Sequence, residues 1–196
     1  MAGDTWVFGY GSLVSPASLA TTIERTVAPA DVAVATLHGY GRRWNYGAGR
    51  LQCSWTLDGV EVDDGVMVAL GLVRSEHESC NGVAFKVTPT ELEHLDRRER
   101  NYDRTDITDL ITLDDPVPGV ATASPSGATF VTYVPRAGAI EHYETARDAG
   151  RAAIRQSYWD LVLDAFETLG GTHPERYATT PQPDVPVVEM TWNIVG

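Results

Sequence analysis

Residues 6–13 read Trp-Val-Phe-Gly-Tyr-Gly-Ser-Leu, an apolar run that passes directly into a Gly-Tyr-Gly-Ser turn. The run has the composition of a short buried β-strand. The glycines at positions 9 and 11 let main-chain amides approach a ligand without interference from a Cβ atom, and Ser12 adds a hydroxyl. The stretch therefore predicts a first strand that ends in a ligand-binding loop.

Length and composition favour a single globular domain. The chain has 196 residues, of which 43% are apolar and 21% charged, which is enough for one core. We expect one domain over residues 1–196. The formal net charge is −12, and Lys86 is the single lysine, which argues against a nucleic-acid partner. A small anionic substrate remains compatible with this charge, because main-chain amides can hold a carboxylate locally.

Cysteine, histidine and apolar patterns favour a cytoplasmic protein. The two cysteines, Cys53 and Cys80, are too few for a disulfide framework. The first residues lack the pattern of a signal peptide, and no apolar run reaches the length of a membrane span. The histidines and cysteines show no metal-ligand spacing. We expect a cytoplasmic protein with no membrane anchor and no metal.

Strand and helix patterns follow each other irregularly, which predicts an α+β fold with a mixed β-barrel and helices packed around it. Two proline-containing stretches, 114–127 and 170–186, are predicted to be surface loops where substrate choice could be set. Strands are predicted at 5–9, 33–37, 66–72, 83–87, 106–113, 129–134 and 187–195. Helices are predicted at 15–25 and 89–98, with a further pair within 140–169.

The helix at 89–98 ends next to an acid in an unexpected place. Thr88 and Glu91 form a capping-box pattern around Pro89, which places the start of the helix. Leu92 and Leu95 set its buried stripe, and at about 100° per residue Glu99 falls between them. A carboxylate in an apolar setting must be paired, protonated or used in chemistry.

Two interpretations of Glu99 stay open at this point. In the first, it forms a structural ion pair with one of the nearby arginines at positions 97, 98, 100 and 104. In the second, it is a general acid or base whose pKa is raised by burial, as chemistry near neutral pH requires of a glutamate.

The motifs together resemble the γ-glutamylcyclotransferase-like superfamily, which includes γ-glutamylcyclotransferase, the glutathione-specific ChaC-type enzymes and the AIG2-like proteins. The resemblance rests on the loop at 10–13, on Leu-Asp-Arg-Arg-Glu at 95–99 and on Tyr102 with Arg104. It extends over most of the chain, through 39–44, 81–85, Tyr133 and the closing helices. It implies an α+β fold around a mixed barrel.

The resemblance also implies a cofactor-free enzyme that converts a γ-glutamyl compound to 5-oxoproline and a free amine by intramolecular acyl transfer. Glu99 would be the catalytic acid and base. The substrate would contact Tyr10, Gly11, Ser12, Leu13, Tyr102 and Tyr133. The expected partner is a small γ-glutamyl molecule, and the expected state is a monomer or homodimer. A non-catalytic γ-glutamyl-binding or regulatory protein of the same fold is the alternative.

Three further features qualify these expectations. The ChaC-type pattern places two glycines and a tyrosine after the Arg-Glu pair, whereas this chain has Arg-Asn-Tyr at 100–102, which argues against ChaC-type glutathione specificity. Ser12 is expected to form hydrogen bonds rather than act as a nucleophile, because it lacks the Gly-x-Ser-x-Gly elbow. The arginines Arg42 and Arg43 are interpreted as lying outside a packed sheet, or alternatively as lining the substrate pocket and meeting a carboxylate.

Overall fold

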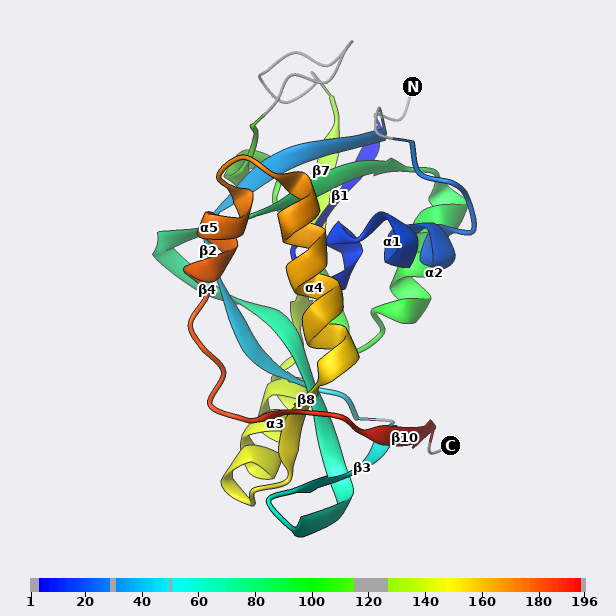
Figure 1. Ribbon diagram of the computed structural model, residues 1–196. Helices are drawn as coiled ribbons and strands as arrows, with labels where there is room; N and C mark the ends of the chain where they lie inside the picture. Colours follow the sequence, from blue (N-terminus) through cyan, green and yellow to red (C-terminus); the bar gives the residue numbers. More distant parts are fainter. Residues whose placement is uncertain (1–3, 29–30, 50, 115–126, 195–196) are drawn as a thin grey trace.

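The computed structural model describes residues 4–28, 31–49, 51–114 and 127–194. The described strands and helices, shown in Figure 1, are unevenly distributed along the chain. The strands are β1 (Thr5–Gly9), β2 (Val32–Gly47), β3 (Leu51–Leu57), β4 (Val60–Val87), β5 (Tyr102–Asp106), β6 (Ile111–Leu113), β7 (Thr129–Pro135), β8 (Ala152–Arg155), β9 (Val187–Val188) and β10 (Thr191–Ile194). The helices are α1 (Pro16–Ile23), α2 (Pro89–Arg98), α3 (Ala137–Asp148), α4 (Gln156–Leu169) and α5 (His173–Ala178), with 3-10 turns η1 (Ser12–Val14) and η3 (Thr108–Leu110).

The sheet is mixed and its strand order is β10-β3-β4-β1-β7-β5, with β2, β6, β8 and β9 joined off this path. Most pairs are antiparallel, but β1 and β7 run parallel, as do β4 and β8 and also β8 and β9. The helices pack around this sheet, and the α+β class predicted from the sequence is confirmed. Among the described strands no closure into a barrel is found.

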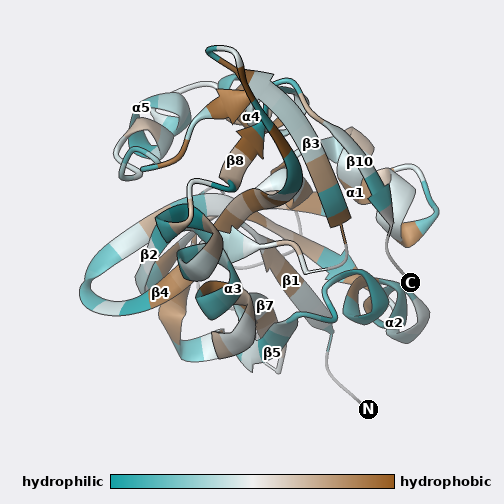
Figure 2. Cartoon of the chain, turned by 90° about the horizontal axis from the view of Figure 1, so that it is seen from below, coloured by the Kyte–Doolittle hydropathy of each residue, from teal (hydrophilic) through white to brown (hydrophobic). Residues whose placement is uncertain are grey.

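β1 lies at the centre of the sheet. It is hydrogen-bonded to β4 on one side, where Val7 faces Phe85, and to β7 on the other, where Val7 faces Val131. Because both neighbours and the helices cover it, Val7 and Phe8 are fully buried. Figure 2 shows the apolar colouring along β1, enclosed by the surrounding elements. The end of this rigid strand is therefore a fixed platform for the loop that follows.

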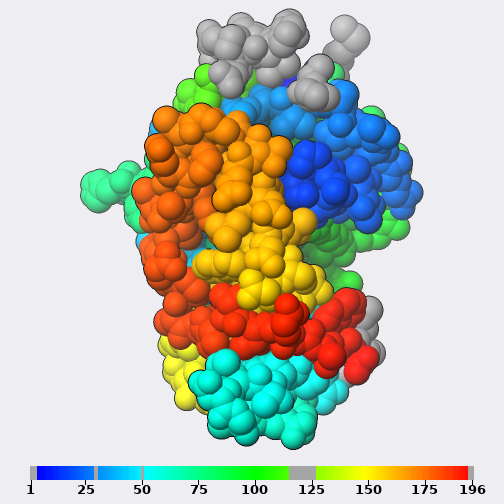
Figure 3. All heavy atoms as spheres, in the orientation of Figure 1, coloured from blue at the N-terminus to red at the C-terminus, as the bar shows by residue number. Residues whose placement is uncertain are grey.

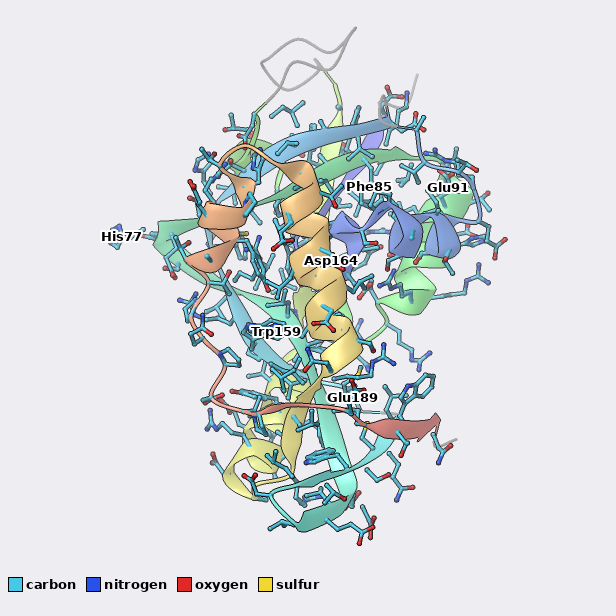
Figure 4. All side chains as sticks on the ribbon, viewed as in Figure 1. His77, Phe85, Glu91, Trp159, Asp164 and Glu189 are labelled. Atoms are coloured by element: carbon cyan, nitrogen blue, oxygen red, sulfur yellow. The ribbon has the colours of Figure 1, made fainter. Side chains whose placement is uncertain are left out.

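The long strands β2 and β4 form a bent ribbon. Their register shifts between His38 and Tyr40, where Gly39 has φ +77° and β4 carries extra residues. His77 lies at the tip of the extra segment and points away from the body, as Figure 4 shows. Because the ribbon bends there, the part of β2 that follows Gly39 packs against α4. Trp44 of this part stacks on Trp159 of α4, with ring centroids 5.1 Å apart.

The structure corrects several predicted elements. β3 and β8 have no predicted counterpart, the strands predicted at 66–72 and 83–87 are both parts of β4, and the strand predicted at 187–195 is divided into β9 and β10. The strand predicted at 106–113 is divided into β5, η3 and β6, because the Asp106 carboxylate accepts a hydrogen bond from the Thr108 amide at 2.9 Å and turns the chain. The loop predicted at 170–186 contains helix α5, whose Tyr177 stacks on Phe166 of α4 at 4.4 Å. The predicted loop at 114–127 lies outside the described residues over 115–126.

The closing part of the chain wraps around the front of the molecule. Figure 3 shows the segment after α5 running across the surface between α4 and the β3–β4 hairpin. There β10 pairs with β3 and β9 pairs with β8. Within the part of the chain that the structure describes, no helix is long and apolar enough to cross a membrane.

Candidate active site

A small cavity lies where the ends of β1 and α2 meet α4. Its wall combines main chain from the turn after β1 with one carboxylate and several phenol rings. The lining residues are Phe8, Gly9, Tyr10, Gly11, Ser12, Leu13, Leu70, Glu99, Tyr102, Tyr133 and Tyr158. Every residue that the sequence assigned to the site lies in this wall, although the assignments of individual roles stay predictions.

The turn after β1, residues 9–13, is called the 9–13 loop below. It folds directly into η1, where the Val14 amide donates to the Gly11 carbonyl at 2.9 Å. The first amides of such a turn have no acceptor within it, so they are available to a ligand. A Cβ atom at position 9 would lie 2.7 Å from the Cβ of Leu13, so glycine allows the tight reversal.

Arg42 of β2 supports the 9–13 loop. Its side chain is buried, with the residue 3% exposed, and its Nε donates to the Tyr10 carbonyl at 2.9 Å. The guanidinium also donates to Asn81 and, at 3.0 Å, to the Thr180 hydroxyl. It lies over the ring of Phe166, at 4.7 Å from the centroid. Arg42 thus ties the loop to β4 and to the segment after α5.

The position of Arg42 corrects one interpretation of the sequence. We expected Arg42 and Arg43 outside the sheet or in the pocket wall, and Arg43 does pair with Glu78 at 2.8 Å near the surface. Arg42 instead is buried and its partners are neutral oxygens. Alternation along β2 gave a usable signal, because Tyr40, Arg42 and Trp44 are two residues apart and all three are buried.

Helix α2 positions Glu99. The predicted capping box is present, with Thr88 accepting from the Glu91 amide and Glu91 accepting from the Thr88 amide. Glu91 also pairs with Arg25 at 2.5 Å, which fixes α2 beside α1, as Figures 1 and 4 show. At the other end Glu99 is the C-terminal cap, and its amide donates to Leu95 at 2.8 Å.

The Glu99 carboxylate is largely buried, and within the described part of the chain its salt-bridge partner is Arg98. Its side chain is 14% exposed, and Oε1 lies 3.0 Å from Nε of Arg98. Burial raises the pKa of Glu99, and the Arg98 charge opposes that rise. The structure therefore contains the ion pair of the first interpretation and the raised pKa that the second requires, and the role of Glu99 as a general acid or base stays a prediction.

Phenol groups surround this carboxylate. Tyr10 donates to the Tyr133 carbonyl at 2.7 Å, and Tyr102 donates to the Leu70 carbonyl at 3.3 Å. Tyr133 donates to Oδ1 of Asp96 at 2.8 Å. Burial raises the pKa of each phenol, that of Tyr158 to about 12. The cavity wall therefore presents neutral hydroxyl groups at physiological pH.

Sequence reasoning missed several residues around the cavity. Leu70 comes from the middle of β4 and Tyr158 from α4, and neither position carries a local motif. Arg98 was considered only as an ion-pair partner, yet it also donates to Oγ of Ser12 at 2.8 Å. No histidine is among the described residues of the wall, so a serine nucleophile activated by histidine has no support here.

This arrangement suits proton transfer close to a bound carbonyl. One largely buried carboxylate with a raised pKa lines the same small cavity as the main chain of the 9–13 loop. The described residues include no group of three or more His, Cys, Asp or Glu side chains placed to hold a metal ion.

Comparison with known proteins adds a family and a fold. A family model described as ChaC-like protein matches residues 5–136, which include the 9–13 loop, Glu99, Tyr102 and Tyr133 but end before α4. A solved structure described as gamma-glutamyl cyclotransferase is 14% identical, with a TM-score of 0.53 over 92% of this chain and 90% of that chain. A protein from Homo sapiens described as uncharacterized gives 14% identity, a TM-score of 0.51 and the same coverage.

A yeast gamma glutamyl cyclotransferase specific to glutathione is 15% identical, with a TM-score of 0.47 over 76% of each chain. No curated protein matches the sequence. At 14% identity, the two matches with TM-scores of 0.53 and 0.51 indicate the fold alone.

Proposed function

The chain belongs to the ChaC-like family of γ-glutamylcyclotransferases, and on that premise we propose that it converts a γ-glutamyl compound to 5-oxoproline and a free amine. The observation that carries the proposal is the largely buried carboxylate of Glu99 in the cavity formed by the 9–13 loop. The reaction needs no cofactor in this proposal, because both bond changes occur within the substrate.

Glu99 performs both proton transfers in the proposed mechanism. Its carboxylate takes a proton from the substrate's α-ammonium group, and the free amine attacks the γ-carbonyl carbon. A new C–N bond closes the five-membered ring, and the ring nitrogen releases its remaining extra proton to water. The bond to the leaving nitrogen breaks as Glu99 returns its proton to that nitrogen, which leaves the Glu99 carboxylate ionised for the next turnover.

The 9–13 loop has two tasks in this proposal. Amides at the start of η1 hold the glutamyl carboxylate or support the negative charge that develops on the γ-carbonyl oxygen. The neighbouring phenols of Tyr102 and Tyr133 confine the glutamyl group so that amine and carbonyl lie close together. The leaving group extends away from these shared contacts, so its identity is a matter for a substrate panel.

The proposal is tested by measuring 5-oxoproline release from γ-glutamyl dipeptides, γ-glutamylamines and glutathione. We expect turnover of at least one class, and we expect Glu99→Gln to lower kcat about 1,000-fold, as loss of a general acid-base group does. Glu93→Gln is the matched control, because Glu93 is an exposed acid on the same helix. Full activity in Glu99→Gln would refute the mechanism.

The alternative is a γ-glutamyl-binding protein without turnover. Its signature would be saturable binding of a γ-glutamyl ligand, measured by calorimetry, together with no 5-oxoproline at any pH. That result would refute the proposed activity, but it would support the cavity as a binding site for a γ-glutamyl ligand.

A further inference from the structure

Arg98 joins the acid to the 9–13 loop. Its Nε lies 3.0 Å from Oε1 of Glu99, and its Nη2 donates to Oγ of Ser12 at 2.8 Å. A third contact, from Nη1 to the Thr22 hydroxyl, connects the same guanidinium to α1. One planar group therefore spans the end of α2, the start of η1 and α1.

Arg98 itself is not part of the cavity wall. Its side chain is 30% exposed and reaches Glu99 and Ser12 from outside the cavity. Its direct contacts with the cavity wall are therefore made through these two residues, both of which line the wall.

The other groups that face Glu99 are neutral phenols from every element packed around it. They are Tyr10 before η1, Tyr46 in β2, Tyr102 in β5, Tyr133 in β7 and Tyr158 in α4. Burial raises the pKa of each of them, so none carries a charge near neutral pH. Asp96 and Arg104 lie close by, but they pair with each other at 2.6 Å. Arg98 is thus the charge that opposes the effect of burial on the pKa of Glu99.

We propose that Arg98 is the positioning residue of this site: its guanidinium clamps Glu99 to Ser12, which fixes the acid relative to the 9–13 loop and keeps it ionised for the first proton transfer. This inference rests on the proposed function, because it assigns a task within that reaction. An ordinary half-exposed ion pair would contribute little to stability and nothing to the reaction.

Four variants separate the charge of Arg98 from its shape. Arg98→Met removes both, so we expect kcat to fall about 100-fold through misplacement of the acid, and the acidic limb of the kcat/KM profile to move to higher pH. Arg98→Lys retains the charge but cannot bridge two partners, so the limb stays near that of the wild type while kcat falls about tenfold. Ser12→Ala is expected to give the same result as Arg98→Lys, an acidic limb near that of the wild type and a kcat about tenfold lower.

The double variant Arg98→Lys with Ser12→Ala is expected to have the same kcat as the less active of the two single variants. Both changes break the same contact, between Arg98 and Ser12, so their effects do not add. Arg97→Met is the matched control, since Arg97 is exposed and its Nε donates to the Glu93 carbonyl of its own helix, at 3.3 Å. It should leave kcat and the pH profile unchanged.

A measurement without turnover keeps this test apart from the test of function. In protein labelled with ¹³C at glutamate side chains, the Glu99 signal is assigned by its absence from Glu99→Gln and is then titrated. We expect a higher midpoint in Arg98→Met than in the wild type and in Arg97→Met. Coincident midpoints, or coincident acidic limbs, would overturn the proposal. A wild type without turnover would refute the proposed function, and the titration would still decide the role of Arg98.

Discussion

Two arginines hold the 9–13 loop, and their surroundings differ. Arg42 binds the Tyr10 carbonyl from a buried position among neutral oxygens and aromatic rings. Arg98 binds the Ser12 hydroxyl from a partly exposed position and faces the carboxylate of Glu99.

The difference indicates separate tasks. A buried guanidinium without a carboxylate partner requires every hydrogen bond that it makes, so Arg42 fixes the shape of the loop. An arginine beside a titratable acid changes the charge state of that acid, so Arg98 acts on the reaction. The comparison predicts that changes near Arg42 alter stability and that changes near Arg98 alter pH dependence.

Arg42→Met is expected to have the largest effect on stability. It leaves the oxygens of Tyr10, Asn81 and Thr180 without their donor, so we expect the free energy of unfolding to fall by about 3 kcal/mol. Urea denaturation measures this change. Arg98→Met is the comparison variant and should cost less than about 1 kcal/mol, as is usual for partly exposed ion pairs. Equal costs for the two variants would contradict the division of tasks.

Thr180→Val tests the same region with a smaller change. It removes one acceptor of Arg42, at Nη1, and retains the size of the side chain. We expect a loss of about 1 kcal/mol in the free energy of unfolding. Thr179→Val is the control, because the Thr179 hydroxyl binds only the Arg176 carbonyl of its own turn. If both variants cost the same, the segment after α5 does not support Arg42.

Local signals in the sequence predicted the parts of this site that depend on neighbouring residues. The capping box and Pro89 gave the bounds of α2, and the apolar run gave those of β1. The break in the strand predicted at 106–113 was not foreseen, because the Asp106 side chain interrupts the strand by accepting a hydrogen bond from the nearby Thr108 amide. Helix α5 escaped prediction because it is stabilised by the stacking of Tyr177 on Phe166.

The contacts that join distant segments were beyond local patterns. Arg42 forms hydrogen bonds with Tyr10 and Thr180, which are far from it in the sequence. No local sequence pattern around these two residues predicts the contacts. The placement of Glu99 was predictable because helical periodicity put it on the apolar stripe. Its coupling to Ser12 through Arg98 was not, because that link depends on how α2 and η1 pack against each other.

Glu99→Gln has a second expected effect, smaller than those at Arg42, that sharpens the contrast between the two arginines. Burial raises the pKa of Glu99 in the folded state above its unfolded value, despite the charge of Arg98. The folded protein therefore binds the proton more tightly than the unfolded chain does. The stability that this provides is complete below the unfolded pKa and is lost as pH rises through the folded pKa.

Glutamine does not ionise, so Glu99→Gln should avoid that loss. Relative to the wild type, its free energy of unfolding is expected to rise as pH increases from about 4 to 7, where carboxylates titrate, and urea denaturation across this range measures the difference. Glu93→Gln is the matched control, because Glu93 is an exposed acid on the same helix. A wild type that gains stability over Glu99→Gln with rising pH would mean that the Arg98 charge outweighs burial and that the pKa of Glu99 is lowered in the folded state rather than raised.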